Sequence, residues 1–498
     1  MTLILDNRHD FSLENFARVA WMGDTVALSD SAQQAMQHSR QNFMQLLDTR
    51  PDLHIYGVTS GYGQNASVRL DGEARAEHAA RPPFQSMAGF GPDLPERIKR
   101  GIVFCRLTNF IEGHAAVTPA LAGEVARMLD HPLPKVPASG NASAGEIIPL
   151  SHLFVPMTQG FELAEKETIA LINGSPCASA LMADVALATE RRLALVLDIF
   201  SMAIEALGAP IEAYDESLET LYGDPCISYV LQQIRSRIDM GNPERRSYQA
   251  PVSWRIVPQM LGQLVRTHRQ LIDAATCALS AITDNPVVVA NPNLPFDEAT
   301  RVLSNGGFHN ANACAAIDAV TGSFADIATL ADRQVSKLFD GNVSRLPAQL
   351  KADINDGYLG CIGFVAADYA ERARTTATRT GLIGSEGGGF GQNDILIPTF
   401  QAWEKCVRAG EALDACLAVL AVTCSQAFQV APQSRCPKNL QHLLDETRFH
   451  VPPMVTFRAV GFSVGDLAAG FTQQVYMQSD SKNNTNNDSD GASKNGGT

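Results

Sequence analysis

The chain has 498 residues, of which 45% are hydrophobic and 18% are charged, as is usual for a soluble globular protein with a large core. The net charge of -14 argues against a general nucleic-acid-binding or anionic-membrane-binding surface. The first residues carry no signal-peptide pattern, and no stretch has the uninterrupted apolar length that a membrane helix needs. The ten cysteines include no CxxC pair, which favours buried thiols over disulfides or zinc. We therefore expect a cytoplasmic protein without a metal site.

The first 200 residues are predicted to form a mixed N-terminal domain. Residues 3–5 form a possible short strand, and Ser29 and Asp30 cap a helix that runs to about Leu47. Residues 54–63 hold three glycines within seven positions, a spacing that defeats both helix and strand and so predicts a loop. Residues 94–130 have helical periodicity with few breaks.

Residues 136–154 form the stretch around which the chain is organised. Residues 138–145 are all small, whereas residues 146–154 turn apolar and predict a buried helix with Pro149 in its first turn. A tight loop that enters a helix presents free backbone N–H groups and a partial positive charge, which suit an electrophile or an anion. Taken alone, a linker before a helix is the commoner explanation.

Long apolar helices are predicted for the central and C-terminal domain, residues 201–477, and the first of them begins at residue 177, in the N-terminal domain. Such helices have apolar residues on more than one face, which indicates a large core or a subunit interface, and we expect a homo-oligomer. The polar residues 478–498 are predicted to be a disordered tail. The fold class is therefore mainly α, and the helical ranges are 177–207, 256–282, 308–340, 361–381 and 398–430.

Short motifs in the connectors, in this order and on this helical background, resemble the aromatic amino acid ammonia-lyase family. The motifs are Tyr56-Gly57-Val58 with Gly61-Tyr62-Gly63, Pro149-Leu150-Ser151-His152, Leu171-Ile172-Asn173-Gly174, Thr283-Asp284-Asn285-Pro286, Ser304-Asn305-Gly306 with Phe308-His309, and Leu346-Pro347. The resemblance covers about residues 50 to 470. It implies a long-helix bundle of the fumarase/aspartase-like superfamily type, and a homotetramer with sites assembled from several subunits.

The resemblance also implies roles for individual residues. Tyr56 matches the base, which needs a lowered pKa because a free phenol titrates near 10. Asn173 matches the residue that holds the substrate amine or the cofactor, and Arg255 the one that pairs with the substrate carboxylate, a task for which its planar fork is suited. Phe308 matches an aromatic pocket wall. The structural alternatives are packing on a glycine-rich turn for Tyr56, a subunit ion pair for Arg255 and core packing for Phe308.

The family's electrophile, methylidene-imidazolone (MIO), forms from an internal Ala-Ser-Gly, and here that tripeptide is altered. The family register falls on Ser143-Ala144-Gly145, which leaves alanine at the serine position. Ala138-Ser139-Gly140 lies five residues upstream, and Ala142-Ser143-Ala144 is one residue out of register. Ser143 is thus the candidate catalytic serine, but the altered register argues against an MIO, and no other cofactor is expected.

Two further departures concern the pocket. Val252 stands where the family has another catalytic tyrosine, with Tyr248 nearby as a possible substitute. The pair that reads the substrate ring falls on Cys105 and Arg106, and an inward-facing Arg106 predicts an anionic or strongly polar far end of the substrate. Alternatively, Arg106 reaches a carboxylate such as Glu112.

A last departure lies in the connector before residue 398. Asn393 stands where histidine lyases tend to carry glutamate, and Glu386 is the candidate for a displaced acid.

Three hypotheses follow. The first is a carbon–nitrogen lyase that eliminates ammonia or an amine from a histidine-like or other aromatic amino acid, with amino-group migration left open. The second is a relative without MIO, like the ergothionase branch that expels trimethylamine from a betaine of thiolated histidine. The third is a non-catalytic scaffold, against which the joint presence of Tyr56, Asn173 and Arg255 argues. The expected partners are a small-molecule substrate and further copies of the chain, without nucleic acid or membrane.

Overall fold

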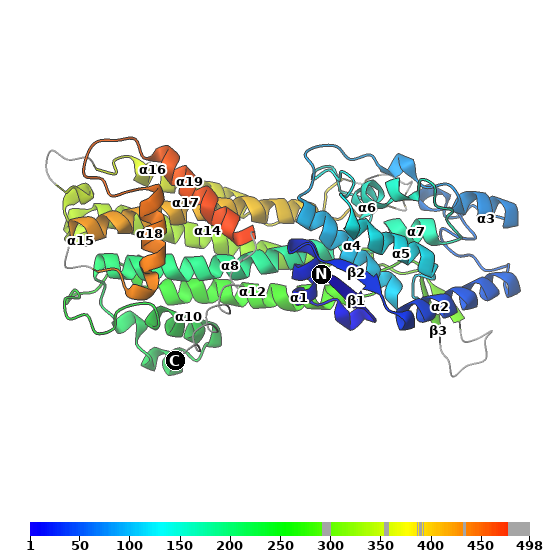
Figure 1. Ribbon diagram of the computed structural model, residues 1–498, viewed down its shortest axis with the longest axis horizontal. Helices are drawn as coiled ribbons and strands as arrows, with labels where there is room; N and C mark the ends of the chain where they lie inside the picture. The colour runs from blue at the N-terminus through cyan, green and yellow to red at the C-terminus, as the bar shows by residue number, and fades with distance from the viewer. Residues whose placement is uncertain are drawn as a thin grey trace, which may run out of the picture.

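The protein is mainly helical in the computed structural model, which describes residues 1–290, 300–352, 358–385, 387, 391, 393–431 and 435–476 (Figure 1). The expectation of a mainly α long-helix bundle is confirmed. The predicted tail and Glu386 lie outside the described residues, and the division at residue 200 stays a prediction.

The N-terminal part combines short helices with a small parallel sheet, in which Thr2 pairs with Thr25. As predicted, Ser29 caps the second helix, because its side chain accepts the Ala32 N–H. The elements are β1 (Thr2–Leu5), α1 (Leu13–Phe16), β2 (Thr25–Leu28), α2 (Asp30–Thr49), α3 (Gly72–Ala79), α4 (Glu96–Ile111), α5 (Pro119–Arg127), α6 (Ile147–Phe154) and α7 (Glu167–Ile172).

The expected helical character of residues 94–130, with few breaks, is confirmed. One break separates α4, which ends at Ile111, from α5, which begins at Pro119. Gly113 lies between them with φ +81°, and a Cβ there would come within 2.5 Å of the Ser39 Cβ. The close approach of α2, where the Ser39 hydroxyl donates to the Gly113 carbonyl at 2.7 Å, explains the break.

Among the remaining elements, α8, α12, α14 and α17 pack on one another to form the bundle, α16 covers α14 and α17, and β3 lies beside α2 (Figure 1). The five predicted long helices are all present, with ends that differ from the predicted ones by at most five residues. The elements are α8 (Pro176–Leu207), α9 (Ser217–Tyr222), α10 (Pro225–Arg235), α11 (Val252–Arg255), α12 (Val257–Leu279), β3 (Val287–Ala290), β4 (Thr300–Leu303), α14 (Ala311–Phe339), α15 (Gly341–Ser344), α16 (Ile362–Thr376), α17 (Thr399–Val430), α18 (Gln441–His450) and α19 (Gly461–Tyr476).

Three helical segments are long and apolar enough, by length and composition alone, to cross a membrane: Glu167–Leu207, Ala311–Phe339 and Thr399–Val430. The expectation that no stretch reaches this length is therefore wrong. Their apolar windows are 100%, 61% and 89% buried inside the chain, in that order. The apolar surface of these helices is thus largely used in forming the core of the bundle.

A buried ion pair holds three helices of the bundle together. Arg192 of α8 donates from Nε and Nη2 to the two carboxylate oxygens of Asp414 on α17, at 2.8 and 2.9 Å. Thr472 of α19 donates its hydroxyl to the same carboxylate at 2.9 Å. The two charges are thus paired and the carboxylate has a third donor, as a buried pair requires.

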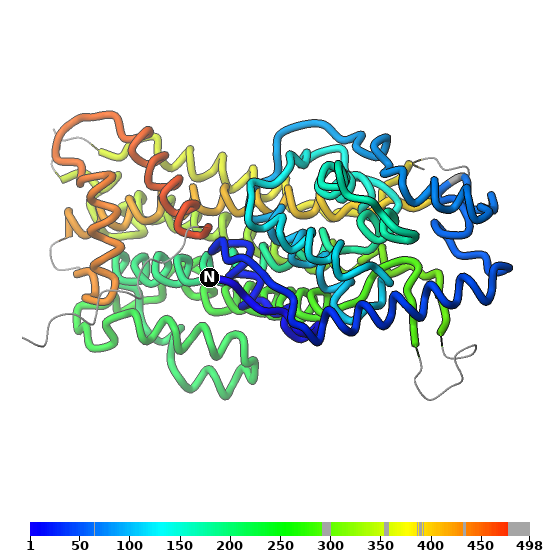
Figure 2. The backbone as a smooth tube through the Cα atoms, turned by 45° about the vertical axis from the view of Figure 1, so that its right-hand side comes forward, coloured from blue at the N-terminus to red at the C-terminus, as the bar shows by residue number. Residues whose placement is uncertain are grey.

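A second buried carboxylate, Asp184 of α8, joins the N-terminal segment to the bundle. It accepts hydrogen bonds from the Arg97 guanidinium at 2.8 Å and from the indole N–H groups of Trp21 and Trp403 at 3.1 and 3.3 Å. The Arg97 guanidinium also lies over the Tyr476 ring, 4.0 Å from its centroid. The end of α19 therefore lies beside the N-terminal segment (Figure 2).

Candidate active site

The small-residue loop, residues 138–145, lies at the N-terminal ends of several helices. Glu146, the residue that follows the loop, is buried and accepts the backbone N–H groups of Cys177 and Ala178 at 2.5 and 2.7 Å, at the N-terminus of α8. These bonds lower the pKa of the Glu146 carboxyl, but burial outweighs them and raises the pKa to about 7. Sequence reasoning missed this group, whose only signal was a lone acid at the start of an apolar helix.

The rest of the loop contacts the beginnings of two more helices. The Ile397 N–H, just before α17, donates to the Ser143 carbonyl at 3.0 Å. Gly145, with φ +75°, packs under Phe308, just before α14, so closely that a Cβ would lie 3.2 Å from the Phe308 Cβ. The loop thus meets the N-terminal ends of α6, α8, α14 and α17, whose dipoles favour negative charge there.

The loop that carries Tyr56 packs on α7, the helix that ends at Asn173. The Gly57 backbone packs against the Ile169 side chain of α7 so closely that a Cβ on Gly57 would lie 3.2 Å from the Ile169 Cγ1. Asn173 ends that helix one turn later, where its N–H donates to the Ile169 carbonyl. The Tyr56 hydroxyl oxygen accepts the Gly63 N–H at 3.1 Å, but burial raises its pKa, so the phenol is neutral at neutral pH.

Arg106 is fully buried beside Asn173. Its Nη1 donates to the Asn173 carbonyl, whereas Nε and Nη2 have no hydrogen-bond partner among the described residues. Nη2 lies 3.0 Å from where a Gly174 Cβ would stand. The alternative pairing with Glu112 is wrong, because Glu112 instead contacts Arg8 at 3.7 Å. The guanidinium therefore retains free donors inside the protein, which is costly unless an acceptor meets them.

Other buried groups surround Arg106. Cys105 precedes it, and burial raises the pKa of this thiol well above its usual value, so the thiol is neutral. Lys166 and Asp284 form a fully buried ion pair at 2.5 Å, and the second oxygen of Asp284 has no partner among the described residues. In the sequence, Asp284 stands out only because it belongs to the motif of residues 283–286, and this motif does not indicate that Lys166 is its partner.

Arg255 and Val252 lie at the other end of the molecule. The neighbouring Trp254 donates its indole N–H to the carbonyl of Ala203 at 3.0 Å, and Ala203 is 27 residues after Pro176 in α8. At about 1.5 Å per residue, some 40 Å of helix separate them from the small-residue loop. Arg255 is exposed and lines a cavity of about 640 Å³ together with Val252 and Tyr248. Within one chain the structure does not bring Arg255 to Tyr56.

Asn393 is half-buried and lies four residues before Ile397, in the segment that reaches the Ser143 carbonyl.

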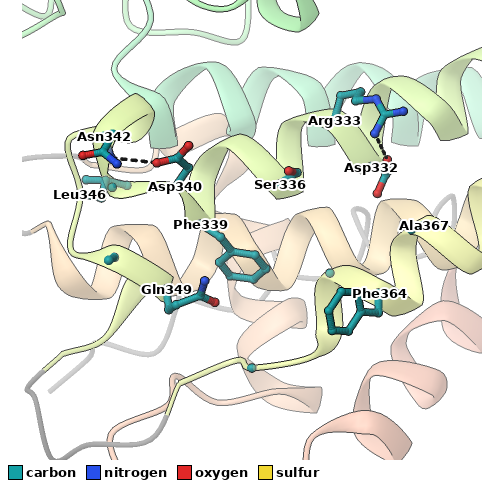
Figure 3. A pocket seen from close by; sticks show the side chains of 14 residues that line it. Asp332, Arg333, Ser336, Phe339, Asp340, Asn342, Leu346, Gln349, Phe364 and Ala367 are labelled. Carbon is teal, nitrogen blue, oxygen red and sulfur yellow. Dashed lines mark hydrogen bonds and ion pairs between the residues drawn. The ribbon is translucent and has the colours of Figure 1, made fainter.

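A cavity of about 710 Å³ lies at the α15 end of the bundle, between α14 and α16 (Figure 3). In its wall, Arg333 pairs with Asp332 at 3.2 Å and the Asn342 N–H donates to Asp340 at 3.0 Å. None of Tyr56, Ser143 and Asn173 lines it. Among the described residues, no cluster of three or more metal-ligating side chains occurs.

The residues present do not fit an MIO in the family register. Ala144 stands at the position of the serine that must dehydrate, and its methyl group has no hydroxyl to lose. Ser143 donates its hydroxyl to the Gly145 carbonyl at 2.7 Å.

The sequence profile of the aromatic amino acid lyase family matches residues 11–161 and 158–448. The chain belongs to this family. Its members are carbon–nitrogen lyases, so the expected enzyme class is confirmed. A histidine ammonia-lyase of Halalkalibacterium halodurans is 24% identical over 481 residues, which cover 90% of this chain and 92% of that one.

Solved structures share the fold of this aromatic amino acid lyase. The ergothionase of Treponema denticola, in complex with desmethyl-ergothioneine sulfonic acid, has a TM-score of 0.86 at 17% identity and covers 96% of this chain and 99% of that chain. The Pantoea agglomerans phenylalanine aminomutase has a TM-score of 0.84 at 19% identity, covering 95% and 100%. At these identities the likeness concerns the fold alone.

Proposed function

We propose that the protein is a carbon–nitrogen lyase that eliminates an amine from an aromatic, histidine-like amino acid or its N-methylated betaine. Tyr56 removes the β-proton, Asn173 positions the amine and Arg255 of a neighbouring subunit binds the carboxylate. The observation that supports the proposal is the small-residue loop at four helix N-termini, together with the packing of the Tyr56 segment on the helix that ends at Asn173. Dipoles so oriented stabilise negative charge that develops on the substrate when the β-proton leaves.

A quaternary amine is the leaving group that we favour over ammonia. Ammonia is a poor leaving group, and Ala144 removes the hydroxyl from which the family's electrophile forms. A trialkylammonium group leaves without an electrophile, and its charge acidifies neighbouring protons. The free donors of buried Arg106 suit a sulfur anion or another acidic group on the substrate ring. The molecule bound to the Treponema ergothionase carries such a group, a sulfonic acid.

Intact mass spectrometry of the purified protein, with peptide mapping across residues 137–157, tests the first step. We expect the unmodified mass, because Ala144 cannot dehydrate. A mass lower by the two waters that MIO formation removes, localised to residues 142–145, would contradict this expectation. It would then favour ammonia as the leaving group.

Product assays separate the two leaving groups. We expect trimethylamine release from a betaine of thiolated histidine to exceed ammonia release from histidine, phenylalanine and tyrosine. Tyr56→Phe should lower kcat by about 100-fold or more, because it removes the proton acceptor and keeps the ring. Full activity of Tyr56→Phe on every substrate would exclude Tyr56 as the base.

A further inference from the structure

The motif of residues 283–286 lies beside the segment that follows α7. The Thr283 hydroxyl oxygen accepts the backbone N–H of Ser175 at 3.0 Å. Gly174, with φ +91°, leaves little room for a side chain, since a Cβ there would lie 3.0 Å from the Thr283 Oγ1. Thr283 therefore contacts the two residues that directly follow Asn173, and the proposed function leaves its hydroxyl without a role.

Asn109 of α4 holds Thr283 in place. Its side-chain oxygen accepts the Thr283 N–H at 2.7 Å and the Thr283 hydroxyl at 3.3 Å. Asn109 is buried, and Arg106, which donates to the Asn173 carbonyl, lies three residues earlier on the same face of α4. The Thr283 hydroxyl thus both donates and accepts a hydrogen bond. One face of α4 therefore holds the Asn173 carbonyl directly and the Ser175 N–H through Thr283.

The Asn173 side chain takes its orientation from the same backbone. Its Oδ1 accepts the Gly174 N–H at 2.8 Å. That N–H belongs to the peptide group whose carbonyl accepts the hydrogen bond from Arg106. An amide oxygen has two lone pairs, so the second lone pair of Oδ1 remains for the amine of the proposed substrate. A shift of the backbone at residues 174 and 175 would therefore move the oxygen that contacts the amine.

The next residue of the motif holds the other end of α7. Asp284 forms an ion pair at 2.5 Å with Lys166, the residue that precedes α7, and both side chains are fully buried. Lys166 has φ +72°, a left-handed conformation that is uncommon for a residue other than glycine. Thr283 and Asp284 thus fix the end and the start of the helix that leads to Asn173.

We propose that Thr283, held by Asn109, is a positioning residue that aligns the Asn173 amide with the amine leaving group. The inference rests on the proposed function, in which Asn173 positions the amine. Thr283 acts only through Asn173 and does not contact the substrate. Elimination needs the breaking C–N bond aligned with the proton that Tyr56 removes, and a misplacement of about 1 Å can lower the rate by about 100-fold.

Thr283→Val tests this role, because valine keeps the shape of threonine and removes the hydroxyl that binds Ser175. We expect kcat to fall by about 100-fold. KM should change little, because Arg255 binds the carboxylate. Thr283→Ser restores the hydroxyl and should regain kcat. Thr447→Val is the matched control, because the buried Thr447 hydroxyl donates within α18 to the Leu443 carbonyl at 2.7 Å, and it should keep the wild-type kcat.

A double-mutant cycle separates positioning from a purely structural role. In an Asn173→Ala background, Thr283→Val should change kcat by about twofold or less, because the side chain that Thr283 positions is gone. An equal fall of kcat in both backgrounds would overturn the proposal. A wild-type kcat of Thr283→Val would overturn it as well.

Hydrogen exchange tests the same contacts without substrate. In Thr283→Val, the backbone N–H groups of residues 174 and 175 should exchange about tenfold faster than in the wild type, because the Ser175 N–H loses its acceptor. Thr447→Val should leave the exchange of these two residues unchanged.

This measurement also distinguishes failure of the proposal from failure of the proposed function. If the wild type eliminates no amine from any substrate, the proposed function fails, whereas unchanged exchange at residues 174 and 175 in Thr283→Val overturns the positioning. If Thr283→Val does not fold, Asn109→Ala takes its place, because it removes the acceptor that holds Thr283. It should give the same faster exchange, and unchanged exchange would again overturn the positioning.

Discussion

Glu146 couples the small-residue loop to pH. Its pKa rises from 4.5 to about 7 in the folded protein, so the fold favours the protonated carboxyl. The corresponding stability is fully present below about pH 4.5 and is lost as the pH rises through about 7. Relative to Glu146→Gln, the wild type should lose on the order of 3 kcal/mol of unfolding free energy between about pH 4.5 and pH 8. Denaturant unfolding of both proteins across this range measures the difference.

The control is Glu404→Gln, a change to a half-exposed side chain on α17 that is 3.7 Å from Arg408. Its unfolding free energy should run parallel to that of the wild type over the same range. A constant difference between wild type and Glu146→Gln would mean that Glu146 does not titrate there.

Single residues were predictable to the extent that motifs contain them. Phe308 packs on Gly145, and the segment of Tyr56 packs on the helix that ends at Asn173. Each of these residues stands in a motif with a fixed local conformation. The environment of Glu146 was not predictable, because its partners, Cys177 and Ala178, are 31 and 32 residues away in sequence. For Arg106 the sequence left open whether the side chain faces inward, because its contact with the Asn173 carbonyl depends on how α4 packs beside α7.

Among the elements, α8, α17 and α19 depend on one buried charge pair. Asp414→Asn should lower the unfolding free energy by about 3–5 kcal/mol, because it leaves Arg192 buried without its counter-charge. Thermal unfolding followed by circular dichroism measures the loss. Arg374→Gln, at an exposed pair with Glu371 on α16, should leave the melting temperature unchanged. Equal melting temperatures for the two variants would contradict the role of Asp414.

The long helices were predictable because their Ala, Leu and Val residues recur with helical spacing over many turns. The break between α4 and α5 was not, because it depends on the contact of Gly113 with Ser39 of another helix. Similarly, the pattern of residues in α8 did not indicate that Arg192 pairs with Asp414, which is 222 residues later in the sequence.

For the whole molecule, the separation of Arg255 from Tyr56 along α8 predicts a site shared between subunits. Tyr56→Phe and Arg255→Ala should each be nearly inactive alone. When the two variants are denatured and refolded together, about a quarter of the sites should combine intact residues from different chains, if subunits mix at random. The regained kcat, measured per chain, tests this arrangement.

Tyr56→Phe mixed with Asn173→Ala is the matched control, because the Tyr56 segment packs on the helix of Asn173 within one chain, so that no mixed site should be intact. Activity in this mixture equal to that of the first would contradict the division of residues. Lack of recovery in the first mixture would exclude Arg255 from the shared site. The family resemblance implied a site shared between subunits. The helical pattern of the sequence did not predict it, because that pattern does not tell which end of a helix contacts another copy of the chain.

Asp184 also determines what the protein's fluorescence reports. Two of the three tryptophans, Trp21 and Trp403, hydrogen-bond this one carboxylate, and the third, Trp254, lies at the far end of α8. Emission from the first two therefore follows the docking of the N-terminal segment on the bundle, and emission from Trp254 follows the neighbourhood of Arg255. Single-tryptophan proteins would give separate optical signals for the two ends of the molecule during unfolding or assembly.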